Sequence, residues 1–252
     1  MNISYSALAG FYDALNAHVD YGRIADFYER IFKRFGLRPE IVADLACGTG
    51  TLTEIMAGRG YDMIGIDSSD AMLNAAQEKR ARSGLDILYL NQDMASFELY
   101  GTVGAVVSSL DSINHLTDKN ALMRCFENCH MYLDPGGVFI FDVNTAYRLK
   151  KVLHGTTAVY ETDDVFCAVE HSYNERRRRF YYDMTLFEKT KDGSYVREDD
   201  YVEERAYELT ELSDMLYEAG FDRVYVYGEY KLRSPKEDCE RAVFAAVKEK
   251  MK

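Results

Sequence analysis

Residues 42–50 read VADLACGTG, an apolar run that contains one acid, Asp44, and ends in a loop with two glycines, Gly48 and Gly50. The apolar run predicts a buried strand. The glycines predict a tight turn where a ligand can approach the main chain, because no Cβ stands in the way. An ordinary strand-to-helix turn with a chance acid is the simpler explanation. The coincidence of the acid and the glycines at one strand end favours a binding loop.

Between residues 41 and 143, apolar runs of strand length alternate with helical segments. The run IVADLAC at 41–47 is followed by the helical segment TLTEIMAGR at 51–59, and four more apolar runs continue the arrangement. Parallel strands need crossover connections and are buried on both faces, so this pattern predicts an α/β fold with helices on both sides of a parallel sheet. Residues 221–230 and 241–249 predict two further strands, which we expect to pair in antiparallel fashion at one sheet edge.

The first 36 residues are expected to be helical, because IADFYERIFKRF at 24–35 carries apolar residues at helical spacing and Gly36 is a typical helix stop. Further along, DPGG at 134–137 is expected to end a helix and to start the fifth strand.

Residues 144–206 have the character of antiparallel strands. The runs VFCAVEHSYN, RRFYYDMTLFEK and SYVREDDYVEE are rich in aromatic and alternating residues, and Asp192-Gly193 is typical of a hairpin turn. Ligands of open parallel sheets bind at the carboxyl ends of the strands, and the insert leaves from such an end, so we expect it to cover the site. The expected organisation is a helical cap at 1–36, an α/β ligand-binding domain formed by 37–143 and 207–252, and a small antiparallel β insert at 144–206.

The composition restricts the partners of the chain. Its 42 acids and 30 bases give a formal charge of -12, which disfavours binding to nucleic acid. The basic run Arg176–Arg179 is best explained as a solvated hairpin end. No apolar run is long enough for a membrane span and no secretion signal is apparent, so a cytoplasmic location is expected. The five scattered cysteines predict no disulfide framework, and Cys125 and Cys129 lack the further ligands of a metal site.

Acids also end the second and third predicted strands, as Asp67 and Asp93. A carboxylate at the position of Asp67 can accept both hydroxyls of a ribose, and Asp93 can accept from an adenine amino group. Met72 and Met94 are suited to pack on the faces of the ring. With Asp44, these residues predict a site for an adenosine that lies across the strand ends.

The loop does not match a dinucleotide site, because Thr53 stands where the third glycine of that fingerprint is expected. An acid inside the first strand would also lie unfavourably near a pyrophosphate. A zwitterionic tail removes both difficulties, since Asp44 or nearby carbonyls can neutralise an amino group while the loop binds a carboxylate. An adenosine with an amino-acid tail is S-adenosylmethionine.

On these residues the chain resembles the class I S-adenosylmethionine-dependent methyltransferases, whose first motif VADLACGTG matches. The resemblance spans residues 41–143 and 207–247, and it implies a Rossmann-like, seven-stranded, mostly parallel sheet with an antiparallel last strand. Taken with the residues argued above, it predicts a set of cofactor-binding residues: Tyr5, Tyr12, Asp44, Ala46, Gly48, Gly50, Asp67, Ser68, Met72, Asp93, Met94 and Leu110.

Two shorter stretches, YSALAGFYD at 5–13 and SSLDSINHL at 108–116, are similar to those of bacterial amino-sugar N,N-dimethyltransferases. That similarity implies that Tyr5 approaches the cofactor and that His115 lines the acceptor pocket, which makes both of them catalytic candidates. Uncharacterised bacterial methyltransferases are similar over the whole length.

The function expected is methyl transfer to a small molecule, at an amine nitrogen or a hydroxyl. Proximity and orientation are the main catalytic terms of an in-line displacement. A neutral His115 can take or relay a proton, although a packing role for it is an equal alternative. The absence of an Asn-Pro-Pro-Tyr or Asp-Pro-Pro-Tyr motif after the fourth strand argues against methylation of amino-purines or glutamine. An RNA or protein methyltransferase and a non-catalytic S-adenosylmethionine-binding protein remain alternatives, and the oligomeric state is open, with a homodimer among the options.

Overall fold

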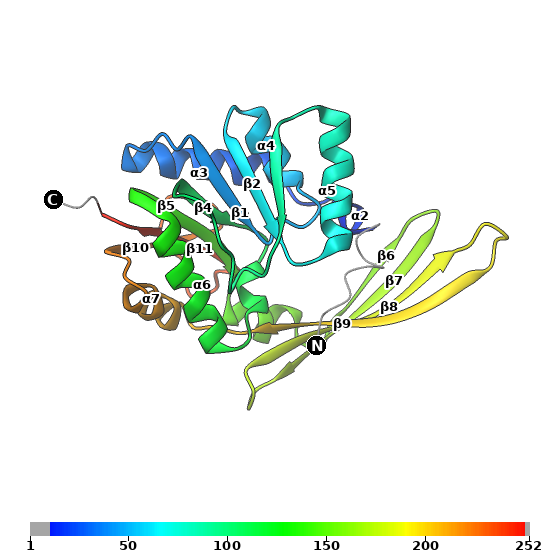
Figure 1. Cartoon of the computed structure of the whole chain (residues 1–252). Coiled ribbons are helices and arrows are strands. Elements are labelled where there is room, and N and C mark those ends of the chain that lie inside the picture. Colours follow the sequence, from blue (N-terminus) through cyan, green and yellow to red (C-terminus); the bar gives the residue numbers. More distant parts are fainter. Residues whose placement is uncertain (1–10, 250–252) are drawn as a thin grey trace.

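A seven-stranded sheet forms the centre of the molecule in the computed structural model, which describes residues 11–249 (Figure 1). Its strands lie in the order β10-β11-β5-β4-β1-β2-β3. Only β11 runs against the others, because it is antiparallel to both β5 and β10. The predicted fold class is therefore confirmed. The strands are β1 (Ile41–Leu45), β2 (Asp62–Asp67), β3 (Ile87–Asn91), β4 (Val103–Ser108), β5 (Leu133–Asn144), β10 (Arg223–Gly228) and β11 (Arg241–Val247).

Helices cover both faces of this sheet, as Figure 1 shows. One face carries α3 (Tyr21–Phe35), α4 (Thr51–Gly58) and α5 (Asp70–Ser83). The other face carries α6 (Lys119–Tyr132) and α7 (Leu209–Glu218). No helix among the described residues is long and apolar enough to cross a membrane.

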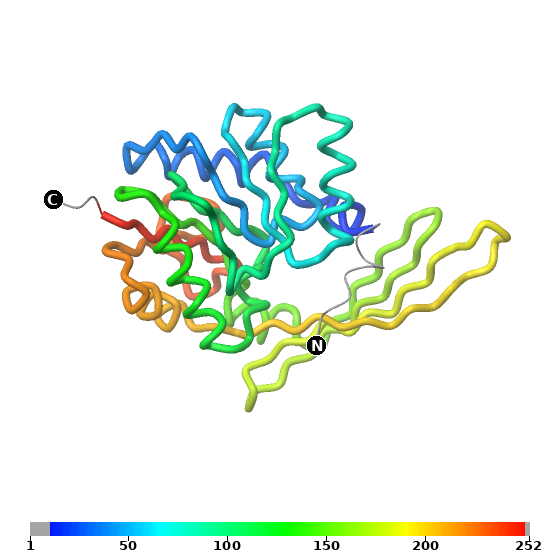
Figure 2. Tube along the Cα trace, viewed as in Figure 1, coloured from blue at the N-terminus to red at the C-terminus, as the bar shows by residue number. Residues whose placement is uncertain are grey.

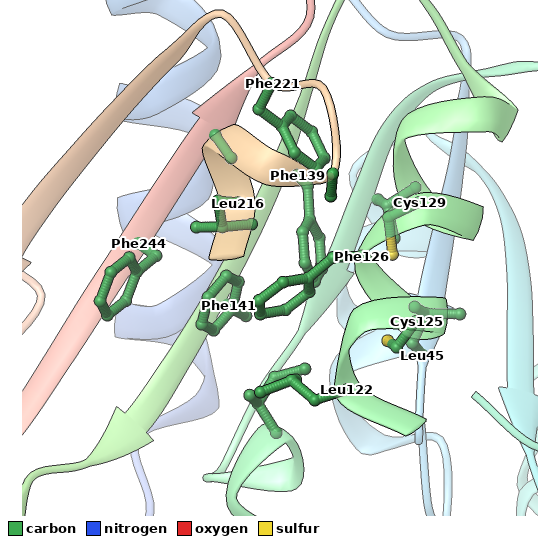
Figure 3. Packing of buried hydrophobic residues seen from close by; sticks show 14 of the residues in the cluster. Leu45, Leu122, Cys125, Phe126, Cys129, Phe139, Phe141, Leu216, Phe221 and Phe244 are labelled. Atoms are coloured by element: carbon green, nitrogen blue, oxygen red, sulfur yellow. The ribbon is translucent and has the colours of Figure 1, made fainter. Parts of the chain in front are cut away.

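The sheet is buried on both sides because β1 sends alternate residues into two cores. Val42 packs with the α3–α5 side, and Ala43 and Leu45 pack with the α6–α7 side. Figure 3 shows the second core, where Phe126 of α6 lies 5.5 Å from Phe141 between ring centroids. Asp44 follows the same alternation, so its carboxyl group lies in the protein interior with 1% exposure.

The insert folds as a separate four-stranded antiparallel sheet that extends away from the central sheet (Figures 1 and 2). Its three predicted strands are present, and a short strand that the sequence did not predict, β6, pairs with the first of them. The apolar face of this sheet packs against the short helix α2 (Tyr12–Leu15). Its strands are β6 (Thr157–Glu161), β7 (Val165–Asn174), β8 (Arg179–Lys189) and β9 (Tyr195–Arg205).

Two local expectations need correction. The N-terminal segment is not continuously helical, because α2 ends at Leu15 and α3 begins only after Asp20, whose side chain accepts from the Arg23 amide at 2.9 Å. Gly36 does end α3, in a left-handed conformation with φ 66°. DPGG does not precede β5 but belongs to it, since β5 starts at Leu133 immediately after α6, and the pairing with β4 shifts register there.

The basic run at Arg176–Arg179 lies at the turn between β7 and β8, as predicted, but only its first half is solvated. Arg178 pairs with Glu211 at 3.1 Å and donates to the Ala206 carbonyl. Arg179 donates to the Thr117 carbonyl at 2.7 Å. These two arginines therefore fasten the insert to the central domain.

Candidate cofactor and acceptor site

The loop after β1 winds through three left-handed residues, Ala46 (φ 54°), Gly48 (φ 56°) and Gly50 (φ 74°). A Cβ at Gly50 would lie 2.3 Å from the Tyr89 hydroxyl oxygen, so no larger residue fits there. At Gly48 the nearest atom to a Cβ would be Tyr12 Cε1 at 3.8 Å. The Gly48 side of the loop is thus open to a ligand beneath α2.

Asp44 uses only one of its carboxylate oxygens within the described part of the chain. Its Oδ2 accepts from the Thr53 hydroxyl at 2.6 Å, while its buried Oδ1 has no hydrogen-bond partner among residues 11–249. Burial, with a smaller contribution from the charge of Asp67, raises the Asp44 pKa to about 7 against the opposing effect of the Thr53 hydrogen bond. A buried oxygen of this kind is a strong acceptor for a ligand ammonium group.

Asp67 ties the glycine loop to the end of β2. Its two oxygens accept from the backbone amides of Gly48 and Ser69, each at 2.8 Å. Burial raises its pKa, and the backbone amides oppose that shift. The carboxylate offers about four acceptor positions, and the amides of Gly48, Ser68 and Ser69 do not fill all of them, so a ribose hydroxyl can still be accepted. Ser68, which lies between Asp67 and Ser69 in the sequence, is exposed.

The loop after β3 adjoins the end of β2, because the Gln92 amide donates to the Asp67 carbonyl at 3.0 Å. Asp93 is exposed in this loop, and its Oδ1 accepts from the Ala95 amide at 2.7 Å. Met94 is half-buried beside it, and Met72 is buried in the first turn of α5. The acids predicted from three strands therefore lie along one edge of the sheet.

The exit of β4 is held in an unusual conformation. Leu110 and Asp111 are both left-handed, with φ 55°. Their amides donate to the carboxylate of Asp142, at 2.8 and 3.2 Å. Asp142 is fully buried and also pairs with Arg241, whose second nitrogen donates to Asp111 at 2.6 Å. This network fixes Leu110 beside the predicted site.

A second set of hydrogen bonds connects that exit to the insert. The 3-10 helix η1 (Ser112–His115) carries Asn114, whose side chain binds the backbone of Asn144 and of Arg205. The side-chain amide of Asn144 in turn donates to Glu204 Oε2 at 3.1 Å. Ligand atoms of Asp111, His115 and Glu204 all lie within 4.8 Å of one another.

These three groups have distinct electrostatic environments. Burial acts to raise the Asp111 pKa, but Arg241 and His115 hold it below its usual value. Burial, and then the charge of Asp111, raises the pKa of Glu204 well above its usual value. Burial lowers the His115 pKa despite the nearby Asp111. Its Nδ1 is buried and has no partner among residues 11–249.

The N-terminal helix α2 lies over the glycine loop. Asp13 accepts from the Thr49 hydroxyl at 2.6 Å and pairs with Lys79 of α5. Tyr12, predicted to bind the cofactor, packs between the loop and the insert. Tyr5 lies outside the described residues, so its predicted roles stay predictions.

Several residues of this region were not found from the sequence. Burial, and then the charges of Asp13, Asp44 and Asp111, raise the Tyr21 pKa to about 12, so this phenol lies near both ends of the site. Asp142 could have been recognised as a candidate, because it is an acid within the apolar run FIFDV. No local sequence pattern pointed to Arg241 or Glu204, because their partners are far away in sequence.

The reversed β11, the left-handed glycine loop and the carboxylate at the end of β2 together define a methyltransferase site. The chain belongs to the S-adenosylmethionine-dependent methyltransferases. A sequence profile described as a methyltransferase domain matches residues 42–137. YqeM of Bacillus subtilis (strain 168), named as a methyltransferase with no stated substrate, is 30% identical over 247 residues, which cover 98% of each chain.

Solved structures agree with this assignment. An S-adenosylmethionine-dependent methyltransferase from Clostridium acetobutylicum has a TM-score of 0.86 and 29% identity, over 98% of this chain and 99% of that one. The sugar N-methyltransferase KedS8 from Streptoalloteichus has a TM-score of 0.80 and 20% identity, over 95% and 93% of the two chains, which shows a shared fold. The predicted family, enzyme class and cofactor are therefore confirmed. The free Oδ1 of Asp44, the open Gly48 and the remaining acceptor positions of Asp67 fit S-adenosylmethionine.

Proposed function

We propose that this methyltransferase acts on a small molecule, at an amine nitrogen or a hydroxyl. The observation that carries the proposal is the arrangement of Asp111, His115 and Glu204 within 4.8 Å of one another, at the β4 exit where the insert meets the sheet. A compact polar site under an insert suits a small acceptor. The formal charge of -12 opposes a nucleic-acid acceptor. A cytoplasmic location is part of the same proposal.

The residues of the sheet edge would hold the cofactor along its length. Asp44 would bind the amino group, Ala46, Gly48 and Gly50 would form the cradle, and Asp67 would accept from the ribose. When bound, S-adenosylmethionine supplies an activated methyl group to a nucleophile held opposite its sulfur. The adenine would lie among the remaining predicted residues, which are Ser68, Met72, Asp93, Met94 and Leu110, with Tyr12 and Tyr5 above the loop.

His115 would act on the acceptor. Burial keeps its pKa low, so the neutral ring, with a lone pair that can take a proton, is present at working pH. The Asn114 side chain fixes η1 to β5 and β9, which orients the imidazole. With α2, the insert would exclude water from the acceptor, because both lie against the loops that carry these residues.

The names of two structures with the same fold support the amine option. KedS8 is described as a sugar N-methyltransferase, and CalS10 from Micromonospora echinaspora, with a TM-score of 0.73, as an amino pentose methyltransferase. Both are below 25% identity, so the likeness itself extends to the fold alone.

Transfer of a tritiated methyl group from S-adenosylmethionine tests the proposal. The acceptors are a panel of small amines, a panel of hydroxyl compounds, bulk RNA and a mixture of unfolded proteins. We expect counts in small molecules only, and lower turnover in His115→Ala. His130→Ala is the matched control, because His130 packs against Phe221 at the end of α6. Counts confined to RNA or protein would refute the proposal, and unaltered turnover in His115→Ala would leave that residue a packing role.

A further inference from the structure

The junction between β4, β5 and the insert buries more acid than base. Asp111, Asp142 and Glu204 meet there, and Arg241 is the guanidinium that pairs with the first two of them. Nearby cations have other partners, since Arg148 pairs with Glu240 and Arg205 with Glu211. Buried carboxyl groups in excess need protons or a cation from outside the protein.

The Glu204 carboxyl group lies between the Asn144 side chain and Asp111. The Asn144 side-chain nitrogen lies 3.1 and 3.4 Å from its two oxygens. A Glu204 oxygen also lies within 4.8 Å of an Asp111 oxygen, and the Asp111 charge helps burial to raise the Glu204 pKa, which favours a protonated Glu204. Glu204 is 1% exposed, so bulk water does not solvate a negative charge on its carboxyl group. His115, whose buried Nδ1 has no hydrogen-bond partner among residues 11–249, contributes a ring nitrogen to the same junction.

This junction is connected to the cofactor end of the site. Tyr21 is close enough to both Asp44 and Asp111 for each carboxylate to influence its phenol. Asp44 is the residue placed at the amino-acid tail, next to the sulfur that carries the methyl group. The junction would therefore adjoin the amino-acid end of the cofactor, where the acceptor has to lie for methyl transfer.

We infer that Asp111, His115 and Glu204 together bind the acceptor as a protonated amine, so that cationic amines, and not neutral hydroxyl compounds, are the substrate class. This inference rests on the proposed function and adds Glu204, from the insert, as a residue that selects the acceptor. Asp111 supplies the negative charge, and Glu204 supplies a hydrogen-bonding oxygen. Their different pKa directions support this division between a charged and a protonated carboxyl group.

The proton balance of the step assigns a role to His115. An ammonium nitrogen has no lone pair, so one proton passes from it to the neutral imidazole. The freed lone pair then forms the new nitrogen–carbon bond while the carbon–sulfur bond breaks and its electron pair stays on sulfur. The methylated nitrogen is again cationic and remains paired with Asp111 until it leaves.

A divalent metal fits this junction less well than an amine. Asp111 Oδ1 accepts from Arg241 at 2.6 Å, and both oxygens of Glu204 face the Asn144 amide at 3.1 and 3.4 Å. A metal would have to displace those donors to reach the carboxylate oxygens as a ligand set. An ammonium group needs only the remaining lone pairs, as a donor of two or three hydrogen bonds.

The test compares two probes of similar shape, cyclohexylamine and cyclohexanol, on protein saturated with S-adenosylhomocysteine. Dissociation constants come from chemical-shift titrations of the labelled protein. We expect the amine to bind at least about tenfold more tightly than the alcohol, the effect of one charge-assisted hydrogen bond. Asp111→Asn, which removes the charge, and Glu204→Met, which removes the hydrogen-bonding oxygen at similar volume, should each reduce that preference. Glu198→Met, on the same strand but exposed, should keep it.

The outcomes separate this inference from the proposed function. Binding of S-adenosylhomocysteine with equal affinity for both probes would overturn the amine assignment alone, and so would a preference for the amine that persists unchanged in Glu204→Met and Asp111→Asn. Stoichiometric binding of MnCl2 by the wild type, lost in Glu204→Met, would replace the amine with a metal. Failure of the wild type to bind S-adenosylhomocysteine would instead refute the proposed function.

Discussion

At the scale of single residues, the two carboxylate oxygens of Asp44, the acid inside the buried strand β1, have different surroundings. The Thr53 hydroxyl donates to one oxygen, and the other has no partner among residues 11–249, which suits the proposed contact with a ligand ammonium. The folded protein keeps a proton on this group up to about pH 7, whereas an unfolded chain loses it near 3.8. The group's contribution to stability is therefore complete below the lower value and declines as the pH rises through this window. Above about pH 7 the buried charge therefore lowers the stability of the free protein, and we expect a bound ammonium group to offset that loss.

The pH dependence of cofactor binding follows from that shift. An ionised Asp44 attracts the ligand ammonium, so the affinity for S-adenosylhomocysteine should increase about tenfold between about pH 5.5 and pH 7.5. In Asp44→Asn the affinity should be weaker and nearly independent of pH over this range. Calorimetry at several pH values measures both. A wild-type affinity that falls as the pH rises would contradict the role given to Asp44.

Site residues could be predicted where they stand close together in the sequence or end a recognisable strand. Asp44, Gly48 and Gly50 stand together, and Asp67 and Asp93 end recognisable strands, so their common edge was predictable. The Arg241–Asp142 pair and the Asn144–Glu204 bond join residues 99 and 60 positions apart, and no local pattern reports such a contact. The cofactor contacts of the predicted residues stay predictions.

At the scale of elements, the glycine loop depends on β3 beneath it. The Tyr89 ring lies where Cβ atoms at Gly50 and Gly65 would be, at 2.3 and 2.5 Å. The second glycine of the motif is therefore required by a side chain 39 positions later in the sequence, as well as by its left-handed φ of 74°.

Gly50→Ala should destabilise the protein by about 2 kcal/mol or more, through the left-handed backbone and the clash with Tyr89, and should weaken cofactor binding. Gly58→Ala is the matched control, because Gly58 is the last residue of α4, the helix that Gly50 precedes as N-cap, and nothing lies within 4 Å of the added Cβ. That control should be neutral or stabilising by up to about 1 kcal/mol. Denaturant unfolding measures both, and equal stabilities for the two variants would contradict the packing described.

The conformation of the chain at the end of β4 should depend on Arg241. Arg241→Ala leaves Asp142 and Asp111 buried without their cation, so we expect a loss of about 3–5 kcal/mol in the free energy of unfolding. Arg223→Ala removes an exposed pair with Glu249 and should cost no more than about 1 kcal/mol. Thermal unfolding measures both variants. If Arg241→Ala lost no more stability than Arg223→Ala, the Leu110–Asp111 turn would be held by other contacts.

The order and type of most elements could be predicted, because periodicity of apolar residues is a local property. Connections were less predictable. The break between α2 and α3 follows from α2 docking on the insert, and the DPGG segment joins β5 through pairing with β4. Strand β6 was missed because its residues are mostly exposed and it pairs at the edge of the small sheet.

At the scale of the whole molecule, the insert and α2 act on the site together. The small sheet packs on α2, α2 binds the glycine loop through Asp13, and β9 brings Glu204 to the β4 exit. Distant parts of the chain thus meet at the carboxyl edge of the central sheet, where we propose that the cofactor and the acceptor bind. Figure 2 shows the insert as an extension from this edge.

The central claim is that the strand-end carboxylates converge on one S-adenosylmethionine molecule. Calorimetric titration with S-adenosylhomocysteine tests it most directly, with wild type, Asp67→Ala and Asp62→Ala, the last at the exposed opposite end of the same strand. We predict one binding site per chain, an affinity about 10- to 100-fold weaker in Asp67→Ala, and no change in Asp62→Ala. No binding to the wild type, or equal affinity in Asp67→Ala, would contradict the account.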